Sequence, residues 1–550
     1  MERHWSGFNV RLLTVVLAFS MIFSGCSGGS SSSSESTSSS GDSTSRVATQ
    51  NADVSYNTSS MATAGNTSTT NTAYEEENRA AGERYAEIEE NPFLETSRAP
   101  LSTFSIDVDT ASYANVRRFL NQGQLPPKDA VRIEELINYF EYDYPQPVGD
   151  VPFSVNTEVA ACPWNAKHKI VQIGLQGKKV ALDNAPPSNL VFLVDVSGSM
   201  DSPDKLPLLK DSMRVLVNQL KPQDRVAIVV YAGSSGLVLP STPAANKGEI
   251  ISALNNLEAG GSTNGGQGIQ LAYRVAQENF ISGGNNRVIL ATDGDFNVGV
   301  TSDDALVRLI ENKRESGVFL SVLGFGTGNT NDSMMEKLAD KGNGNYSYID
   351  SENEARKALG EQVAGTLYTI AKDVKIQVEF NPAKVAGYRL IGYENRLLAA
   401  KDFNDDKKDA GEIGAGHSVT ALYEIVPAGQ KVENDGIELR YSKVQPAETR
   451  FSDEVLTVKL RYKAPDESQS RLLTMGLLDK GGSIENASDN LKFATAVAQF
   501  GLLLRGSRYK GAANFNNVLS LSQSSLGGDL KNYRGEFIDL IEKAKRLSRD

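Results

Sequence analysis

The sequence predicts an α/β protein in which a doubly wound, mostly parallel sheet is inserted into a β-rich domain, with helices near the C-terminal end. In the middle of the 550-residue chain, unbroken apolar runs such as 189–194 and 287–291 alternate with amphipathic segments. This pattern is typical of parallel strands that helices cover on both faces. Within the insert, a short edge strand is expected near Leu237 and the last helix at 353–371. On either side, polar and apolar residues alternate, which indicates antiparallel strands with one covered face. The alternating stretches are 153–159 and 169–175 before the insert, and 374–380, 419–425 and 456–462 after it.

The first 25 residues have the composition of a targeting segment. Arg3 and Arg11 precede an apolar run, 12–23, that is too short for a comfortable transmembrane helix. The run ends in Ser24-Gly25-Cys26, which resembles the lipobox of bacterial lipoproteins, where the cysteine becomes the lipidated N-terminus. An ordinary secretory signal with an incidental cysteine is the alternative. The one other cysteine is Cys162, so after lipidation no disulfide pair is left and the exported chain must rely on its core.

Composition divides the rest of the chain into further parts. Serine and threonine dominate the stretch after Cys26, which cannot bury enough apolar surface to fold and therefore reads as a tether. A charged, solvated helix is expected from about Tyr74, followed by a strand from Leu101 to Asp109 and two helices. The expected divisions are a signal peptide at 1–25, the tether at 26–73, an N-terminal α+β segment at 74–150, the two parts of the β-rich domain at 151–185 and 372–470, the inserted domain at 186–371, and a helical C-terminal region at 471–550.

One face of the strand expected at 101–109 carries acidic residues. Strict alternation places Ser105, Asp107 and Asp109 together, with Ile106 and Val108 on the opposite face. Two acids on one face can hold a cation, but a solvated face is the more common arrangement. We therefore expect these side chains to face water.

Five polar residues follow the predicted strands of the insert. Asp195, Ser197 and Ser199 come directly after one buried strand, Thr263 opens an amphipathic segment, and Asp293 ends a second apolar run. Ligands collect beyond the carboxyl ends of the strands in such sheets, and hard oxygen atoms are the ligands that Mg²⁺ prefers. Taken alone, Asp-x-Ser-x-Ser fits equally well with a turn that caps the next helix.

In this order, the five residues resemble the metal-ion-dependent adhesion site of von Willebrand factor type A domains, which have a Rossmann-like sheet. The resemblance implies one Mg²⁺, with Mn²⁺ or Ca²⁺ as substitutes, and one coordination position left for an Asp or Glu of a protein partner. The stretches 102–113 and 292–299 are similar to those of bacterial von Willebrand factor type A lipoproteins. That family carries its own N-terminal segment and a C-terminal domain without assigned function. Because the site is expected at a solvent-facing sheet edge, its substitution should leave the fold intact.

These features predict a membrane-anchored, Mg²⁺-dependent protein-binding module of the cell envelope that serves in adhesion or as a scaffold. The net charge of -12 and the pI near 5.1 disfavour nucleic acid as a partner, and no small-molecule substrate is evident. A metal-assisted hydrolase and a purely structural lipoprotein are the alternatives. Catalysis has little support, since His168 and His417 lie beside no nucleophile motif. An aspartate directly after the lipidated cysteine would resemble an inner-membrane retention signal. Ser27 stands at that position instead, which favours the outer membrane in a cell with two membranes.

Overall fold

The computed structural model describes residues 82–181, 183, 185–261, 265–294, 303–432 and 453–548. The expected signal peptide, Cys26 and the tether lie outside these residues, and so does Thr263. Among the helices of the described ranges, none combines the length and the apolar character that crossing a membrane requires.

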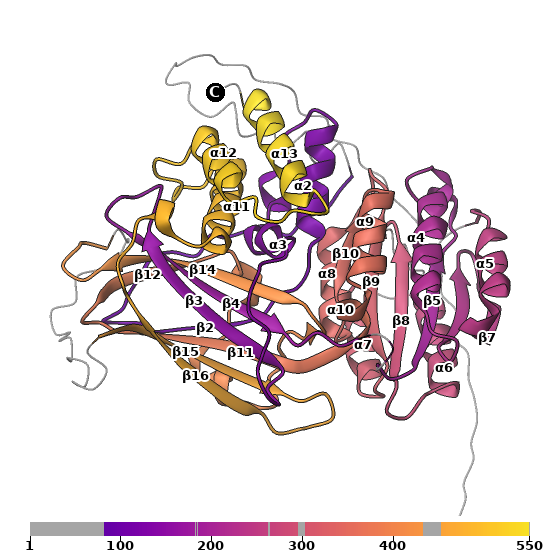
Figure 1. The fold of residues 1–550 in the computed structure, drawn as a ribbon. Helices are drawn as coiled ribbons and strands as arrows, with labels where there is room; N and C mark the ends of the chain where they lie inside the picture. The colour runs from indigo at the N-terminus through magenta and orange to yellow at the C-terminus, as the bar shows by residue number, and fades with distance from the viewer. Residues whose placement is uncertain are drawn as a thin grey trace, which may run out of the picture. The chain divides into compact units, whose positions relative to one another are not determined.

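The inserted domain is built on a six-stranded sheet with the order β10-β9-β8-β5-β6-β7 (Figure 1). All neighbours in this sheet run parallel except β7, which pairs with β6 in the antiparallel direction at one edge. The edge strand that the sequence predicts near Leu237 is therefore present. The strands are β5 (Ser188–Asp195), β6 (Arg225–Tyr231), β7 (Ser235–Pro243), β8 (Asn285–Thr292), β9 (Phe319–Phe325) and β10 (Tyr346–Ile349).

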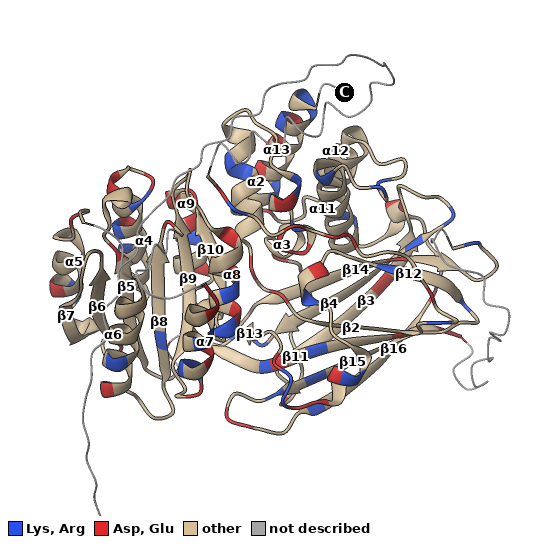
Figure 2. Ribbon diagram, turned by 180° about the vertical axis from the view of Figure 1, so that it is seen from behind, with Lys and Arg blue, Asp and Glu red and all other residues tan. Residues whose placement is uncertain are grey.

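Helices cover both faces of this sheet, which explains why β5 is apolar at consecutive positions. Leu190, Phe192 and Val194 pack in one core, while Val191 and Leu193 pack in another on the opposite face. Strands β5 and β8 are almost entirely tan in Figure 2, and charged residues lie mainly on the covering helices. The first core includes α4 (Leu206–Gln219) and α5 (Lys247–Asn255), and the second includes α6 (Gly265–Glu278), α7 (Asp303–Arg314) and α8 (Asp332–Lys341).

Two antiparallel sheets surround one further core and form the β-rich domain. One has the order β1-β12-β14-β4-β3, and the other has the order β13-β11-β15-β16 with β2 paired to β11. Strand β4 pairs with β14, so a strand before the insert lies beside one after it, as the alternation predicts. The strands are β1 (Leu94–Glu95), β2 (Leu101–Ser105), β3 (Phe153–Ala161), β4 (Lys169–Gly177), β11 (Thr369–Phe380), β12 (Val385–Ile391), β13 (Ile413–Gly414), β14 (Ser418–Pro427), β15 (Glu454–Lys463) and β16 (Arg471–Leu478).

A helical layer joins the N-terminal and C-terminal segments, which lie side by side in Figure 1. Phe140 of the N-terminal segment packs edge to face on Phe493 and Phe537, with ring centroids 4.8 and 5.5 Å apart. Five helices contribute to this core: α2 (Ala111–Asn121), α3 (Ile133–Asn138), α11 (Asp489–Arg505), α12 (Phe515–Ser524) and α13 (Tyr533–Leu547). The C-terminal helices that the sequence predicts are thus part of the same folded body as the N-terminal segment.

Two expected helices differ from the structure. The described part of the helix expected from Tyr74 begins at Gly82, and residues 82–93 are not helical. The helix expected at 353–371 is split into α9 (Glu352–Arg356), a π-helical turn at Lys357–Glu361 and α10 (Val363–Leu367). Gly360 and Gly365 weaken a continuous helix here, and Gly365 packs so closely on His417 that a Cβ would lie 2.1 Å from Nε2 of the ring.

The acidic face expected to be solvated is buried instead. Strand β2 ends at Ser105, and Asp107 and Asp109 are each only 3% exposed. Both carboxylates form ion pairs with Arg396, at 3.1 and 3.2 Å. The expectation of a wet face was wrong because an arginine almost 300 residues further along the chain neutralises the acids.

Candidate metal site at the strand ends

Two carboxylates lie at the carboxyl ends of neighbouring parallel strands. Asp195 is the last residue of β5, and Asp293 directly follows β8. Because β5 and β8 pair in parallel, with Val194 opposite Ala291, the two acids reach the same edge of the sheet. Both are fully buried, so the expectation of a solvent-facing site is wrong for these carboxylates.

Asp195 is fixed by two hydrogen bonds. Its Oδ1 accepts from the backbone N–H of Ser197 at 2.9 Å, and its Oδ2 accepts from the hydroxyl of Thr292 at 3.2 Å. Burial raises the pKa of Asp195 to about 6, even though the hydrogen bonds from Ser197 act in the opposite direction. The carboxylate is therefore ionised at neutral pH, which a ligand for a cation requires.

The serine hydroxyls of the motif lie beside this carboxylate. The Oγ atoms of Ser197 and Ser199 are 3.1 Å apart, and Ser199 is exposed whereas Ser197 is buried. A backbone hydrogen bond of 3.1 Å from Gly198 to the carbonyl of Gly261 holds this turn against the loop before α6. Thr263 lies just beyond Gly261, outside the described residues.

Asp293 is bound by two residues that the sequence reasoning missed. Lys205 Nζ and Asn329 Nδ2 each donate to its Oδ2 at 3.0 Å, and Lys205 also donates to Asn329 Oδ1 at 3.0 Å. Burial alone would raise the pKa of Asp293, but hydrogen bonds from Asn329 and Ser199 and the charge of Lys205 outweigh it and lower the pKa. Asn329 follows β9, whose carboxyl end lies at the same sheet edge. Its position after a predicted parallel strand is the sequence feature that could have indicated Asn329 as part of the site.

The loop that carries Asn329 is held from its other side by the first described residues of the chain. The carbonyl of Thr330 accepts from Arg84 N–H at 2.8 Å, and the carbonyl of Arg84 accepts from Asp332 N–H at 3.1 Å. Glu83 Oε1 also accepts from the backbone of Gly328 at 3.1 Å. One loop thus contacts both the metal-site acid and the segment at 82–85.

These donors fit a small, hard cation. Two carboxylates and two hydroxyls converge on one edge, and the charge of Asp293 contributes to the raised pKa of Asp195. A divalent cation between them would relieve this repulsion. Carboxylate and hydroxyl oxygens suit Mg²⁺, which keeps some of its water and takes few protein ligands.

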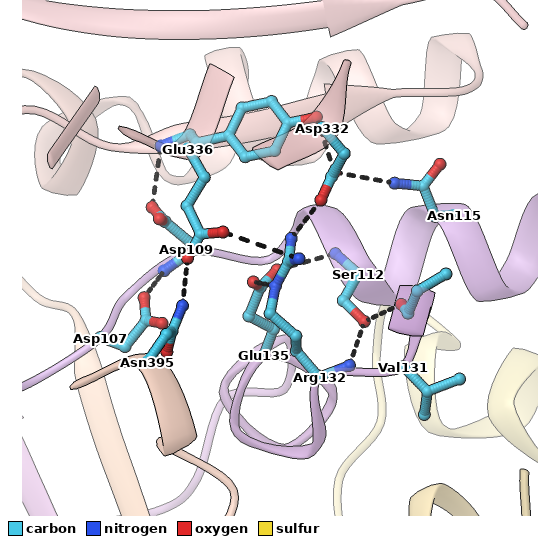
Figure 3. Close-up of polar contacts among 12 residues, drawn as sticks. Asp107, Asp109, Ser112, Asn115, Val131, Arg132, Glu135, Asp332, Glu336 and Asn395 are labelled. Atoms are coloured by element: carbon cyan, nitrogen blue, oxygen red, sulfur yellow. Dashed lines mark hydrogen bonds and ion pairs between the residues drawn. The ribbon is translucent and has the colours of Figure 1, made fainter. Parts of the chain in front are cut away.

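A second group of acids looks like a metal site but is already neutralised. Asp107, Glu135 and Glu336 bring carboxylate oxygens within 4.8 Å of one another. Arg132 binds Glu135 and Glu336, as Figure 3 shows. Arg396 binds Asp107 and Glu336. Since guanidinium groups already occupy these oxygens, the group is an ion-pair network that joins the N-terminal segment, α8 and the β-rich domain.

The inserted sheet with acids and hydroxyls at its strand ends defines a von Willebrand factor type A domain. Three family models match the chain: von Willebrand factor type A domain over residues 189–362, von Willebrand factor over residues 79–172, and Uncharacterized protein YfbK, C-terminal, over residues 365–547.

Individual proteins are similar to most or to part of this chain. YfbK of Escherichia coli (strain K12) is 46% identical over 471 residues, which are 84% of this chain and 81% of that protein. The chain therefore belongs to the family of YfbK. Inter-alpha-trypsin inhibitor heavy chain H3 of Bos taurus is 27% identical over 261 residues, 44% of this chain and 28% of that protein. A solved structure, von Willebrand factor type A from Catenulispora acidiphila, is 16% identical with a TM-score of 0.38 and covers 70% of this chain and 90% of that one.

Proposed function

We propose that this protein is a Mg²⁺-dependent protein-binding module, anchored in the cell envelope, that binds an acidic group of a partner. The observation that carries the proposal is the convergence of Asp195, Asp293, Ser197 and Ser199 at the carboxyl ends of two parallel strands. That edge is where ligands bind in open α/β sheets.

Each residue of the motif has a distinct role in this proposal. Asp195 and Asp293 supply negative charge, while the hydroxyls of Ser197, Ser199 and Thr263 supply neutral oxygens. When bound, Mg²⁺, or Mn²⁺ or Ca²⁺ in its place, would offer one coordination position to a carboxylate of the partner. Ser199 is exposed whereas both acids are buried, so the partner would approach from the side of this serine.

Calorimetric titration of Mg²⁺ tests the metal site. Asp195→Ala should abolish binding because it removes a ligand carboxylate, and Thr263→Ala should weaken it. Asp201→Ala is the matched control, since Asp201 is an exposed acid in the following turn and its removal should change nothing. Equal affinity in the wild type and Asp195→Ala would contradict the proposal.

The partner is tested by capture from envelope extract. Capture should require Mg²⁺ and fail in chelator, and the recovered protein should lose its binding when its contacting Asp or Glu is replaced. Capture that ignores chelator would mean that the motif only forms a turn. If the protein were a purely structural lipoprotein, substitutions at the metal site would change its stability and nothing else.

We propose binding rather than catalysis. Both histidines of the described residues make structural contacts away from the candidate metal site. His168 pairs with Glu424 at 2.6 Å, and His417 packs on Gly365. Turnover of an ester or phosphate substrate by the purified protein in Mg²⁺ would contradict this and favour a metal-assisted hydrolase.

The proposed anchor is Cys26, and Ser27 favours the outer membrane where two membranes exist. Labelled fatty acid should enter the wild-type protein, and Cys26→Ala should prevent this and leave the precursor uncleaved or mis-processed. Cys162 is buried, so its replacement by Ala is the control that should leave lipidation unchanged. A wild-type protein without label would refute the anchor.

A further inference from the structure

Lys205 reaches the candidate metal site along a path shaped for it. It precedes α4 and is only 7% exposed. Its aliphatic chain runs so close to Gly326 that a Cβ there would lie 2.3 Å from the Cγ and the Cε of the lysine. Gly326 also has a φ of +74°, which favours glycine, so the backbone leaves room for this side chain.

The ammonium group is held at the end of this path by two acceptors. Lys205 Nζ lies 3.0 Å from Asp293 Oδ2 and 3.0 Å from Asn329 Oδ1. Asn329 in turn donates to the same Asp293 oxygen at 3.0 Å, so the three side chains form a closed ring of hydrogen bonds. The positive charge is therefore fixed next to one of the two proposed ligand carboxylates.

This fixed charge changes the charge balance of the site. Asp195 and Asp293 contribute two negative charges and Lys205 contributes one positive charge, which leaves a net charge of about -1 before a cation binds. A divalent ion would bring these groups to about +1 with Lys205 present and to about zero without it. Only the former leaves positive charge for an acidic ligand.

We propose that the positive charge of Lys205 has two effects: it weakens the binding of the divalent ion, and it keeps the occupied site positively charged for an acidic partner. The inference rests on the proposed function, because it assumes that Asp195 and Asp293 bind the ion. It differs from an ordinary stabilising ion pair in the sign of its effect on metal affinity. A lysine that only stabilised the fold would lower metal affinity when lost, whereas Lys205 raises it when lost.

The test replaces Lys205 with the unbranched, uncharged methionine in the full chain. Lys205→Met should bind Mg²⁺ about tenfold more tightly than the wild type by calorimetry, because a repelling charge close to the ion is removed. Its melting temperature without metal should fall, since Asp293 loses an ion pair, and added Mg²⁺ should raise that temperature more than in the wild type. Lys205→Arg keeps the charge and should restore the wild-type affinity.

Lys337→Met is the matched control, since Lys337 is an exposed lysine on α8 and the same charge change there should leave Mg²⁺ affinity unaltered. Unchanged or weaker Mg²⁺ binding in Lys205→Met would overturn the inference while leaving the proposed function intact. If the wild type and Asp195→Ala bind Mg²⁺ equally, the proposed function fails first. The two failures are therefore distinguishable.

Discussion

Arg396 joins three parts of the molecule, and its removal should expose how much the buried ion-pair network stabilises the fold. Its guanidinium contacts Asp107 and Asp109 of the N-terminal segment, at 3.1 and 3.2 Å, and Glu336 and Asp340 of α8, at 3.3 and 2.5 Å. Arg396 itself is only 9% exposed, in the β-rich domain. Arg396→Met keeps most of the volume of the side chain and deletes the charge that all four carboxylates share.

We expect Arg396→Met to lower the free energy of unfolding by about 3 to 5 kcal/mol at pH 8, because one partner of a buried network is lost. Burial already raises the pKa of Asp340 to about 6 and the pKa of Asp109 well above its ordinary value. Without the arginine these acids take up protons, so the loss should shrink by up to about 1.4 kcal/mol per pH unit and per group towards pH 5.

Urea denaturation at pH 5 and pH 8 measures both effects. Arg356→Met is the control, since Arg356 forms an exposed pair with Glu352 and its loss should cause no measurable change. A loss for Arg396→Met below about 1 kcal/mol, or one that is equal at both pH values, would refute the reasoning.

Three further predictions concern the core and the domain organisation. Burial raises the pKa of Glu135 to about 8 in the folded protein. The proton that Glu135 then holds stabilises the fold fully below the unfolded pKa, and this stabilisation is lost as the pH rises towards 8. In urea denaturation, the stability of Glu135→Gln should therefore decline less between pH 5 and 8 than that of the wild type. Gly268→Ala should lower the melting temperature, because its Cβ would lie 2.7 Å from Cβ of Tyr231, whereas Gly248→Ala in open space should raise it slightly. The segment 186–371 should fold when expressed alone. A fragment starting at Asp373 should not fold, because it lacks the partner strands β2, β3 and β4. A cooperative thermal transition of that fragment would contradict this prediction.

The sequence predicts two kinds of strand: those with polar side chains on one face and apolar side chains on the other, and those that are apolar on both faces. Strand β5 reads as a continuous apolar run because helices cover both faces, and β14 and β15 read as alternating. Strand β16 was not predicted, because Leu472 and Leu478 are about half exposed on a sheet edge and mask the alternation. The apolar residues of β16 do not alternate with polar ones, so the sequence pattern does not indicate a strand there.

The candidate site was predictable to the extent that it depends on strand ends. Parallel pairing of β5 and β8 brings Asp195 and Asp293 to one edge, and the sequence marks both ends. Lys205 and Asn329 were not predictable in the same way, because they reach Asp293 from loops whose paths only the folded chain determines. The network around Arg396 was hidden for a similar reason, since its members come from three distant segments.

The loop between Gly326 and Asp332 links the first described residues of the chain to the candidate metal site. The backbone of this loop forms hydrogen bonds with Arg84 on one side, and the side chain of Asn329 donates a hydrogen bond to Asp293 on the other. If residues 26–73 form the tether that the sequence predicts, tension between the anchor and a captured partner would reach this loop through the segment at 82–85. A pull on the tether would strain the hydrogen bonds of Arg84 and Glu83 to this loop together with the ion pair between Glu83 and Arg118. Part of the load would therefore reach the hydrogen bonds of Asp293, and with them the retention of the partner.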